Sequence, residues 1–398
     1  MARKDSGKVR KFKKSFTGSQ VVDFVKAHIN RVTIRIGIAI LAVLVVIAGY
    51  SIYKRYSSYD DYKVLSEIKT DSGSSSRYLP YMDFVIKYSG DGISYIDSGG
   101  TVWDETYQIK TPIVDICDEY IAVADKNSNN IYIYDEDGKQ GNITTGFPII
   151  KVEVANQGVV AALLEDKNAN YIEVFDKEGN KLVSHKTLLD ENGYPLDFSI
   201  SDDGEKMVVS YITVNNGAMG NKVVFYNFSN SGKNSEDKIA GEHAQYHEVM
   251  VPLVRFLSND TAIAVGENVL SVYHIKDKSE LEEEIKISDE IQKVFYSEEY
   301  VGFILENNNS KNPYRIEVYD LHGKRKMKTE IKMDYDHVDF SGEHVLMYDD
   351  MNCRLISFNG VEKFRTTFRG EMNGIVPVDG GRVFLFMTRS KIQKVKLK

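Results

Sequence analysis

Few residues in this sequence have the types and spacing that chemistry requires. His243 and His247 lie four positions apart, and Glu248 follows the second histidine. On a helix this spacing would place two imidazoles on one face, as many zinc sites do. The surrounding "GEHAQYHEVMV" is a polar stretch between strand-like segments, and it supplies no third ligand. We therefore expect no metal site, and the two histidines stand as the only candidates for one.

A second stretch, "YIDSGGTVWDE" over residues 95–105, contains Asp97, then two Gly and a Trp. It is similar to the tryptophan-docking turn of quinoprotein-type propellers and to the Asp-box of sialidases. Both matches fail on spacing, and Trp103 is the single tryptophan, whereas those proteins repeat their motif in each blade. Gly-x-Ser-x-Gly, His-Glu-x-x-His and phosphate-binding Gly-rich loops are absent from the sequence. We predict no catalytic residue and no cofactor, and we favour a protein that is not an enzyme.

The most regular pattern in the sequence is structural. Alternating apolar residues lead to an aromatic residue, then to Asp or Asn, and then to a turn that contains Gly. Alternation builds a strand with one buried face, Asp or Asn caps the turn through its side chain, and Gly supplies a positive φ. The predicted blade-turn residues are Asp97, Asp135, Asp176, Asn227, Asp320 and Asn359, and a degenerate copy lies at His274.

Prolines add a second signal in the same phase. Pro80, Pro112, Pro148, Pro195 and Pro252 each open an apolar run upstream of a motif copy. Another apolar run follows, then the motif, and then a more polar strand, which makes four strands in each unit of about 40–47 residues. This organisation predicts an all-β propeller of eight four-stranded blades, with seven as the alternative. The first and last units are short, which would be explained if the two chain ends pair to seal the ring.

Charge is distributed unevenly along the 398 residues, which carry a net charge of −8. Residues 1–35 contain ten Lys or Arg and two Asp, and residues 36–53 contain no charge. The uncharged run predicts one N-terminal transmembrane helix, and the basic residues before it predict a cytoplasmic N-terminus. A cleaved signal peptide is disfavoured because the basic region is too long and no small-x-small site follows.

Side chains that flank the apolar run are expected at the membrane interfaces. Arg31 and Arg35 precede it on the cytoplasmic side, and Tyr50, Tyr53 and Tyr56 lie at its outer end. The expected domains are a cytoplasmic basic tail over 1–35, a transmembrane helix over 36–53, a polar stalk over 54–79 and a propeller over 80–398.

Several segments taken together resemble a known family. They include "GDGISYIDSGG", "PIVDICDEYIAVAD", "GYPLDFSISDDGEKMVVSYITV" and "VPLVRFLSNDTAIAVGENVLSVY". They are similar to an uncharacterised family of single-pass membrane proteins from clostridial Gram-positive bacteria, catalogued as a domain of unknown function. The resemblance implies an anchored propeller outside the plasma membrane and carries over no catalytic residue. A more distant, fold-level likeness is to the propeller lipoprotein of outer-membrane protein assembly.

These observations lead to a prediction of function. We expect a plasma-membrane protein whose residues 36–53 lie in the lipid bilayer and whose extracytoplasmic propeller binds an envelope protein or a cell-wall component. The alternative is an extracytoplasmic hydrolase or lyase that acts on envelope polysaccharide. The acidic body disfavours nucleic acid as a partner. Cys117 and Cys353 lie in apolar, strand-like text and are expected to be buried thiols rather than a disulfide.

Overall fold

The computed structural model describes residues 22–23, 31–70, 76–215, 217–229, 232, 238–246, 248–332 and 335–398. It divides the chain into two compact units, Met1–Ser57 and Ser58–Lys398. The first unit contains helix α2 (Arg31–Tyr56). The second unit is built from strands.

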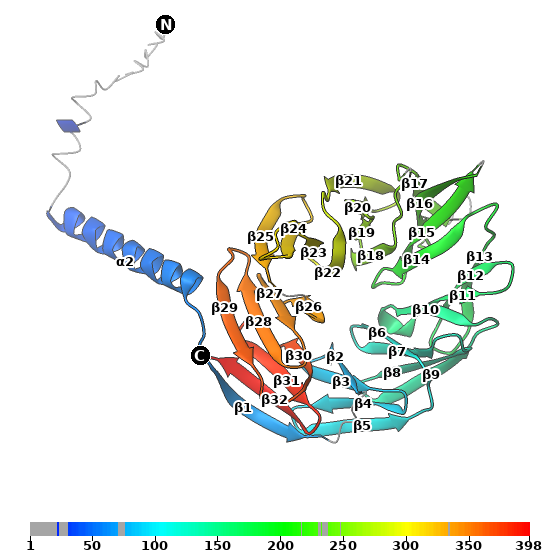
Figure 1. Ribbon diagram of the computed structural model, residues 1–398, viewed down its shortest axis with the longest axis horizontal. Coiled ribbons are helices and arrows are strands. Elements are labelled where there is room, and N and C mark those ends of the chain that lie inside the picture. Colours follow the sequence, from blue (N-terminus) through cyan, green and yellow to red (C-terminus); the bar gives the residue numbers. More distant parts are fainter. Residues whose placement is uncertain are drawn as a thin grey trace, which may run out of the picture. The chain divides into compact units, whose positions relative to one another are not determined.

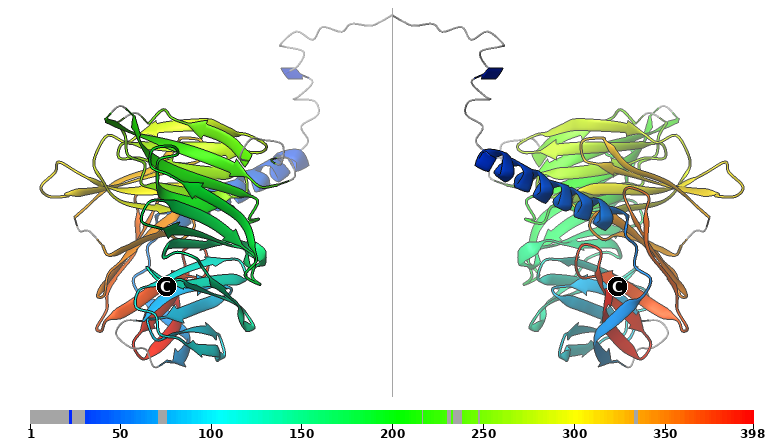
Figure 2. Two further views of the ribbon diagram at one scale, coloured as in Figure 1. Left: turned by 90° about the vertical axis from the view of Figure 1, so that its right-hand side faces the viewer. Right: turned by 90° about the vertical axis from the view of Figure 1, so that its left-hand side faces the viewer.

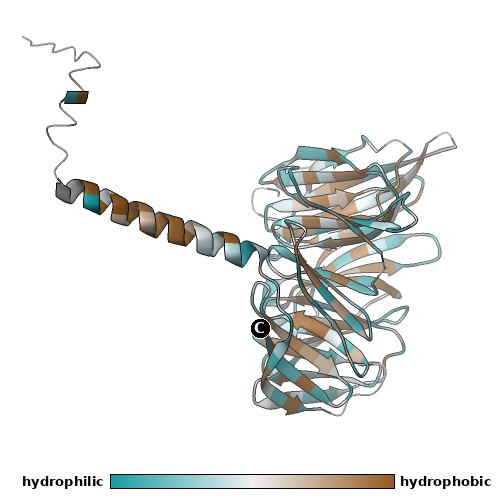
Figure 3. Ribbon diagram, turned by 60° about the vertical axis from the view of Figure 1, so that its left-hand side comes forward, coloured by the Kyte–Doolittle hydropathy of each residue, from teal (hydrophilic) through white to brown (hydrophobic). Residues whose placement is uncertain are grey.

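Helix α2 is apolar on all sides along most of its length (Figure 3). Its segment Ile34–Tyr56 is long and apolar enough to cross a membrane, and the predicted span of 36–53 lies inside it. A helix of 23 residues is about 35 Å long, and the hydrocarbon core of a bilayer is about 30 Å thick. By length and composition, the helix could therefore be a membrane anchor or a signal sequence.

The second unit is a β-propeller. Its described residues form eight four-stranded antiparallel sheets, arranged as blades in a ring (Figure 1). We call the region around the axis of this ring the channel. The predicted fold is thus confirmed, with eight blades rather than seven. In the first seven blades the strand nearest the channel comes first along the chain, and the motif strand is third.

Seven blades are made from consecutive strands, which run in order from the channel outward. The first blade contains β2 (Arg77–Tyr81), β3 (Phe84–Tyr88), β4 (Gly92–Asp97) and β5 (Gly100–Thr106), and the second contains β6 (Pro112–Cys117), β7 (Tyr120–Asp125), β8 (Asn130–Asp135) and β9 (Gly138–Thr144). The third contains β10 (Ile149–Val154), β11 (Val160–Glu165), β12 (Asn170–Phe175) and β13 (Lys181–Thr187), and the short helix η1 (Asn156–Gly158) lies between β10 and β11. The fourth blade contains β14 (Tyr194–Ile200), β15 (Lys206–Asn215), β16 (Ala218–Asn227) and β17 (Ile239–His243). The fifth contains β18 (Leu253–Ser258), β19 (Thr261–Val265), β20 (Val269–Ile275) and β21 (Ser279–Lys286). The sixth blade contains β22 (Ile291–Tyr296), β23 (Tyr300–Glu306), β24 (Tyr314–Asp320) and β25 (Arg325–Ile331). The seventh contains β26 (His337–Phe340), β27 (His344–Tyr348), β28 (Asn352–Ser357) and β29 (Glu362–Thr367).

The eighth blade joins the two ends of the second unit. Its strands are β30 (Met372–Pro377), β31 (Val383–Thr388), β32 (Lys391–Leu397) and, at the outer edge, β1 (Tyr62–Lys69). Strand β1 pairs antiparallel with β32 from Tyr62 opposite Leu397 to Lys69 opposite Lys391. Figures 1 and 2 both show blue β1 beside red β32. The ring is sealed as the sequence predicts.

This closure corrects the expected polar stalk over residues 54–79. Helix α2 continues to Tyr56, β1 occupies 62–69, and β2 begins at Arg77. Tyr59 forms a bridge with Phe364, so the propeller already begins there and not at residue 80. The segment is polar because an outer edge strand faces water on most of its length, which single-sequence patterning does not distinguish from a linker.

Hydrophobic clusters occupy the junctions between blades. Ile133 of the second blade packs in one cluster with Val152 of the third, and Ile172 of the third packs with Phe198 of the fourth. The described residues form eight such clusters, and each draws on two neighbouring blades. A single blade therefore leaves its faces exposed, and only the ring buries them.

Antiparallel order fixes two ends of the ring. The connections from first to second strand and from third to fourth strand lie at one end, which we call the turn end. The connections from second to third strand and from one blade to the next lie at the opposite end, which we call the loop end. The chain enters the propeller at the turn end, because the Tyr59 and Asp60 N–H groups donate to the carbonyls of Lys363 and Lys398 there, at 2.6 and 3.1 Å.

Candidate functional site

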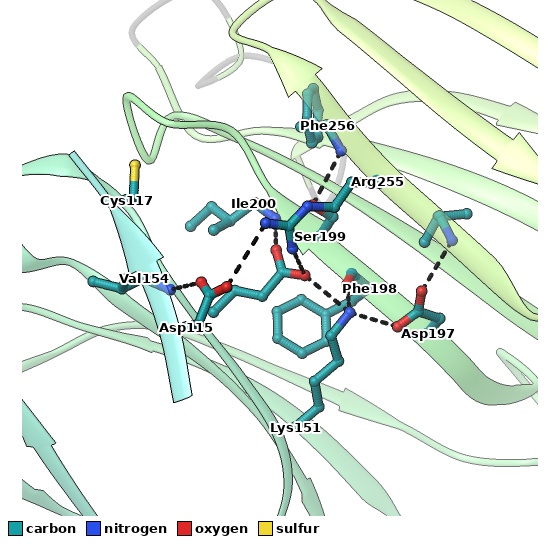
Figure 4. A network of polar contacts seen from close by, with 12 residues as sticks. Asp115, Cys117, Lys151, Val154, Asp197, Phe198, Ser199, Ile200, Arg255 and Phe256 are labelled. Carbon is teal, nitrogen blue, oxygen red and sulfur yellow. Dashed lines mark hydrogen bonds and ion pairs between the residues drawn. The ribbon is translucent and has the colours of Figure 1, made fainter. Parts of the chain in front are cut away.

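Charged side chains gather on the channel side of four neighbouring first strands, β6, β10, β14 and β18 (Figure 4). They are Asp115, Lys151, Glu153, Asp197 and Arg255, which we call the channel network. Strand alternation places them there. On β10, Val152 and Val154 are buried in the blade, so Lys151 and Glu153 point to the opposite side.

Each acid in the channel network accepts a backbone N–H from the next blade. Asp115 Oδ2 accepts from Val154 at 2.8 Å, and Glu153 Oε2 accepts from Ile200 at 3.0 Å. Asp197 Oδ2 accepts from Val254 at 2.9 Å. Inner strands carry unpaired backbone donors along their channel edge, and these carboxylates satisfy some of them. The acids therefore tie four blades together.

Two cations occupy the remaining carboxylate oxygens. Lys151 Nζ lies 2.9 Å from Glu153 Oε1 and 2.6 Å from Asp197 Oδ1. The Arg255 guanidinium lies 2.5 Å from Glu153 Oε1 and 3.7 Å from Asp115 Oδ1. Every oxygen of the three carboxylates thus has a partner within the protein.

The network separates the pKa values of its acids. Burial, together with the nearby charge of Glu153, raises the pKa of Asp115 to about 6. Burial also raises the pKa of Asp197, although Lys151 opposes it. Burial acts in the same direction on Glu153, but Lys151 and Arg255 outweigh it and lower the pKa of Glu153. Glu153 is therefore the negative centre of the network.

The other half of the channel contains a cavity. Its volume is about 1170 Å³, and the first strands β2, β26 and β30 contribute much of its lining. Loop-end residues such as Asp350 and Arg389 complete the lining, so the cavity lies toward the loop end. Its polar lining also includes Arg77, Asp339 and Asn373. We call it the channel cavity.

The predicted blade-turn residues all accept backbone hydrogen bonds within their turns. For example, Asp97 Oδ1 accepts from Gly99 at 2.7 Å, and Asp320 Oδ1 accepts from Lys324 at 2.9 Å. Asp135, Asp176, Asn227 and Asn359 make equivalent contacts, to Asp137, Asn180, Ser229 and Val361 respectively. All six lie at the turn end and away from the channel cavity.

Of the two candidate metal ligands, the structure describes only His243. His243 ends strand β17, contacts Ser279 Oγ at 2.9 Å and packs edge-on against Phe225. His247 lies outside the described residues. In the part of the chain that the structure describes, no group of three or more His, Cys, Asp or Glu side chains could hold a metal ion.

The surroundings of Trp103 and of the two cysteines indicate that these residues have structural roles. Trp103 stacks on Tyr134 of the next blade at 5.5 Å and donates its Nε1–H to the carbonyl of Glu136 at 3.1 Å. Cys353 is buried and Cys117 half-buried, and both are free thiols. The contacts of Trp103 join the first and second blades.

The residues expected at the membrane interfaces lie on α2. The side chains of Arg35, Tyr50, Tyr53 and Tyr56 are exposed, and Arg31 is the first residue of the helix. Their position on a continuous apolar helix is compatible with either use of that helix, as an anchor or as a signal sequence.

Sequence analysis missed both the channel network and the channel cavity. A signal was nonetheless present, because segments such as "IVDI", "IIKVEV" and "LVRF" each carry a charge inside an apolar, proline-led strand. A charge at such a position would be buried at high cost unless it were paired or faced a channel. The identity of the partners could not be read from the sequence, since they come from other blades.

The closed ring of eight antiparallel blades around a polar channel places the chain among the β-propeller proteins. Within that class, it belongs to the family of unknown function DUF5711, whose model matches residues 55–397. No curated protein matches the sequence.

Solved structures show the same fold at low sequence identity. Chaetomium thermophilum Sqt1 bound to the N-terminus of the ribosomal protein L10 matches with a TM-score of 0.53 and 9% identity, over 85% of this chain and 100% of that chain. Citrobacter koseri AztD matches with a TM-score of 0.50 and 9% identity, over 74% and 87% of the two chains. These similarities establish the propeller fold alone.

Proposed function

We propose that this protein is a membrane-anchored, extracytoplasmic binding and scaffolding module, and that its partner is an envelope protein or a cell-wall component. Residues 1–35 would form the cytoplasmic tail and α2 the anchor at the plasma membrane. The propeller would then present its loop end to the partner. Sqt1, a propeller bound to the N-terminus of a ribosomal protein, is an example of the fold holding a protein segment.

The observation that carries the proposal is the use of the channel carboxylates. Five of the six oxygens of Asp115, Glu153 and Asp197 accept hydrogen bonds from backbone N–H groups or cations, and the sixth, Asp115 Oδ1, lies 3.7 Å from the Arg255 guanidinium in an ion pair. A general base needs a free oxygen within hydrogen-bond reach of its substrate. The acids of the channel network therefore stabilise the contacts between blades, which favours a binding function over hydrolysis.

The position of chain entry supports the choice of the loop end. The segment that leads from α2 reaches the propeller at the turn end, where Tyr59 pairs beside Phe364. The loop end lies on the opposite side of the ring and includes the mouth residues of the channel cavity. The loop end is therefore the end of the ring at which the chain from α2 does not enter.

A photocrosslinking experiment in the native membrane tests the proposal. Met351, in a loop-end connection, and Met82, in a turn-end connection, have similar exposed fractions of 41% and 45%. Each is replaced in the intact chain by a photoreactive phenylalanine analogue. We expect a reproducible adduct with one envelope protein or with wall material from position 351, at least fivefold above position 82. Equal yields at the two positions, or no adduct at either, would contradict the proposal.

One observation favours the hydrolase or lyase as a second candidate. Burial and Glu153 give Asp115 a pKa of about 6, while Glu153 has a lowered pKa, and such a separation within one cluster is typical of acid–base pairs. Release of reducing ends from envelope polysaccharide by the purified chain, lost in Asp115→Asn, would establish this activity.

A further inference from the structure

The two halves of the channel use their polar groups differently. In the channel network every carboxylate oxygen has a partner. In the channel cavity, the side chains of Arg77, Asp350 and Asn373 form no hydrogen bond or ion pair with the described part of the chain. Asp339 uses only Oδ1, which accepts the Phe340 N–H at 2.7 Å. The cavity therefore presents donors and acceptors that the fold does not consume.

These groups come from three blades and converge on one space. Arg77 begins β2, Asp339 lies on β26, and Asn373 lies on β30. Guanidinium, carboxylate and carboxamide groups are planar, and each can make two parallel hydrogen bonds. A ligand with pairs of adjacent hydroxyl or amide groups can satisfy all three kinds of group.

The cavity also contains an aromatic plate. The His337 ring stacks on Tyr348 with centroids 4.6 Å apart and planes inclined by 16°. His337 is exposed, and it lines the cavity together with Tyr348. Partial burial lowers the pKa of His337, which favours the neutral imidazole. The plate thus offers an uncharged aromatic surface to a flat, weakly polar face of a ligand.

We propose that the channel cavity binds an uncharged oligosaccharide. A sugar ring has an apolar C–H face that can lie on the His337–Tyr348 plate. Its adjacent hydroxyls both donate and accept, which matches Arg77, Asp339 and Asn373. The volume of about 1170 Å³ slightly exceeds that of typical small-ligand pockets, about 300–1,000 Å³, and suits a ligand of two or three sugar units.

The charge of the lining favours a neutral ligand over a charged one. Arg389 is ion-paired with Glu371, which leaves Arg77 to offset part of the charge of Asp339 and Asp350. A strongly anionic or cationic ligand would gain little from such a mixed lining. This inference rests on the proposed binding function and names a ligand class for the same end of the propeller.

Calorimetric titration of the full-length chain in a non-glycosidic detergent tests the inference. The probes are maltotriose, cellotriose and chitotriose, with trialanine as a peptide probe. We expect one trisaccharide to bind. His337→Ala, Asp339→Asn and Arg77→Gln should each weaken its binding at least tenfold. The matched controls are His322→Ala and Asp83→Asn, which are exposed at the turn end and should leave the affinity unchanged.

The outcomes separate this inference from the proposed function. Absence of trisaccharide binding, binding unaffected by the three cavity variants, or binding of trialanine alone would overturn the oligosaccharide proposal. A loss of binding in Arg77→Gln would not be explained by misfolding, because the Arg77 side chain is exposed and forms no hydrogen bond or ion pair with the described part of the chain. Crosslinking from position 351 would still report on scaffolding, whichever result the titration gives.

Discussion

Asp115 joins two neighbouring blades through a hydrogen bond, but the burial of its charged form lowers the stability of the fold. Its Oδ2 accepts the Val154 N–H at 2.8 Å, yet burial beside Glu153 raises its pKa from 3.8 to about 6. The folded protein thus takes up a proton at this site more readily than the unfolded chain does. The contribution of Asp115 to stability is full below pH 4 and falls as the pH rises to 6.

Replacement of Asp115 by Asn should remove this pH dependence. The amide oxygen can still accept the Val154 N–H, but the side chain no longer ionises. We expect the free energy of unfolding of Asp115→Asn, relative to the wild type, to rise by roughly 2–3 kcal/mol between pH 4 and pH 7. Chemical denaturation at several pH values measures the difference. A difference that stays constant with pH would show that Asp115 does not titrate in this range.

Strand β1 is the element on which ring closure depends. Most of its side chains are exposed, and Tyr62 is the main anchor, with its ring 5.2 Å from that of Phe386. The strand is therefore held largely by its backbone pairing with β32. Without it, β32 would present an open edge to water and to other chains.

Two truncations that differ by one strand test this role. A chain of residues 58–398 keeps β1, and we expect it to melt like the propeller of the intact protein. A chain of residues 71–398 lacks β1, and we expect its Tm to fall by about 5–10 °C and its aggregation to increase. Thermal unfolding followed by circular dichroism compares the two. Partial recovery of Tm on adding a peptide of residues 59–70 would show that the strand itself is responsible.

At the scale of the whole molecule, the eight clusters between blades make the ring one cooperative object. Each blade buries its faces only against two neighbours. Helix α2 is in a separate unit, since it belongs to Met1–Ser57 and the propeller to Ser58–Lys398. Membrane attachment and the propeller fold can therefore be tested independently.

Protease protection on whole cells tests the proposed orientation. Tags are placed before Met1 and after Lys398 in two otherwise identical chains. We expect the C-terminal tag to be removed by external protease and the N-terminal tag to survive, because the basic residues before α2 favour a cytoplasmic N-terminus. The intact chain should also resist alkaline extraction, whereas residues 58–398 should not. Loss of the N-terminal tag in unbroken cells would reverse the orientation.

The sequence alone was sufficient for the features that depend on local patterning. Strand alternation and proline-led runs predicted the blades, and short-range side-chain chemistry predicted turn residues such as Asp97 and Asp320, which accept N–H groups only two to four residues away. The apolar helix could also be predicted from local sequence, since an uncharged apolar run of this length has few alternative structures.

Only the tertiary structure decided which distant segments meet. Tyr62 pairs with Leu397, so a strand that reads as a polar stalk is the seal of the ring. Asp115 and Arg255 form an ion pair between blades, and Arg77 and His337 of different blades line the same cavity. These contacts depend on how eight blades close in space, and no periodicity within one blade encodes the partner that another blade supplies.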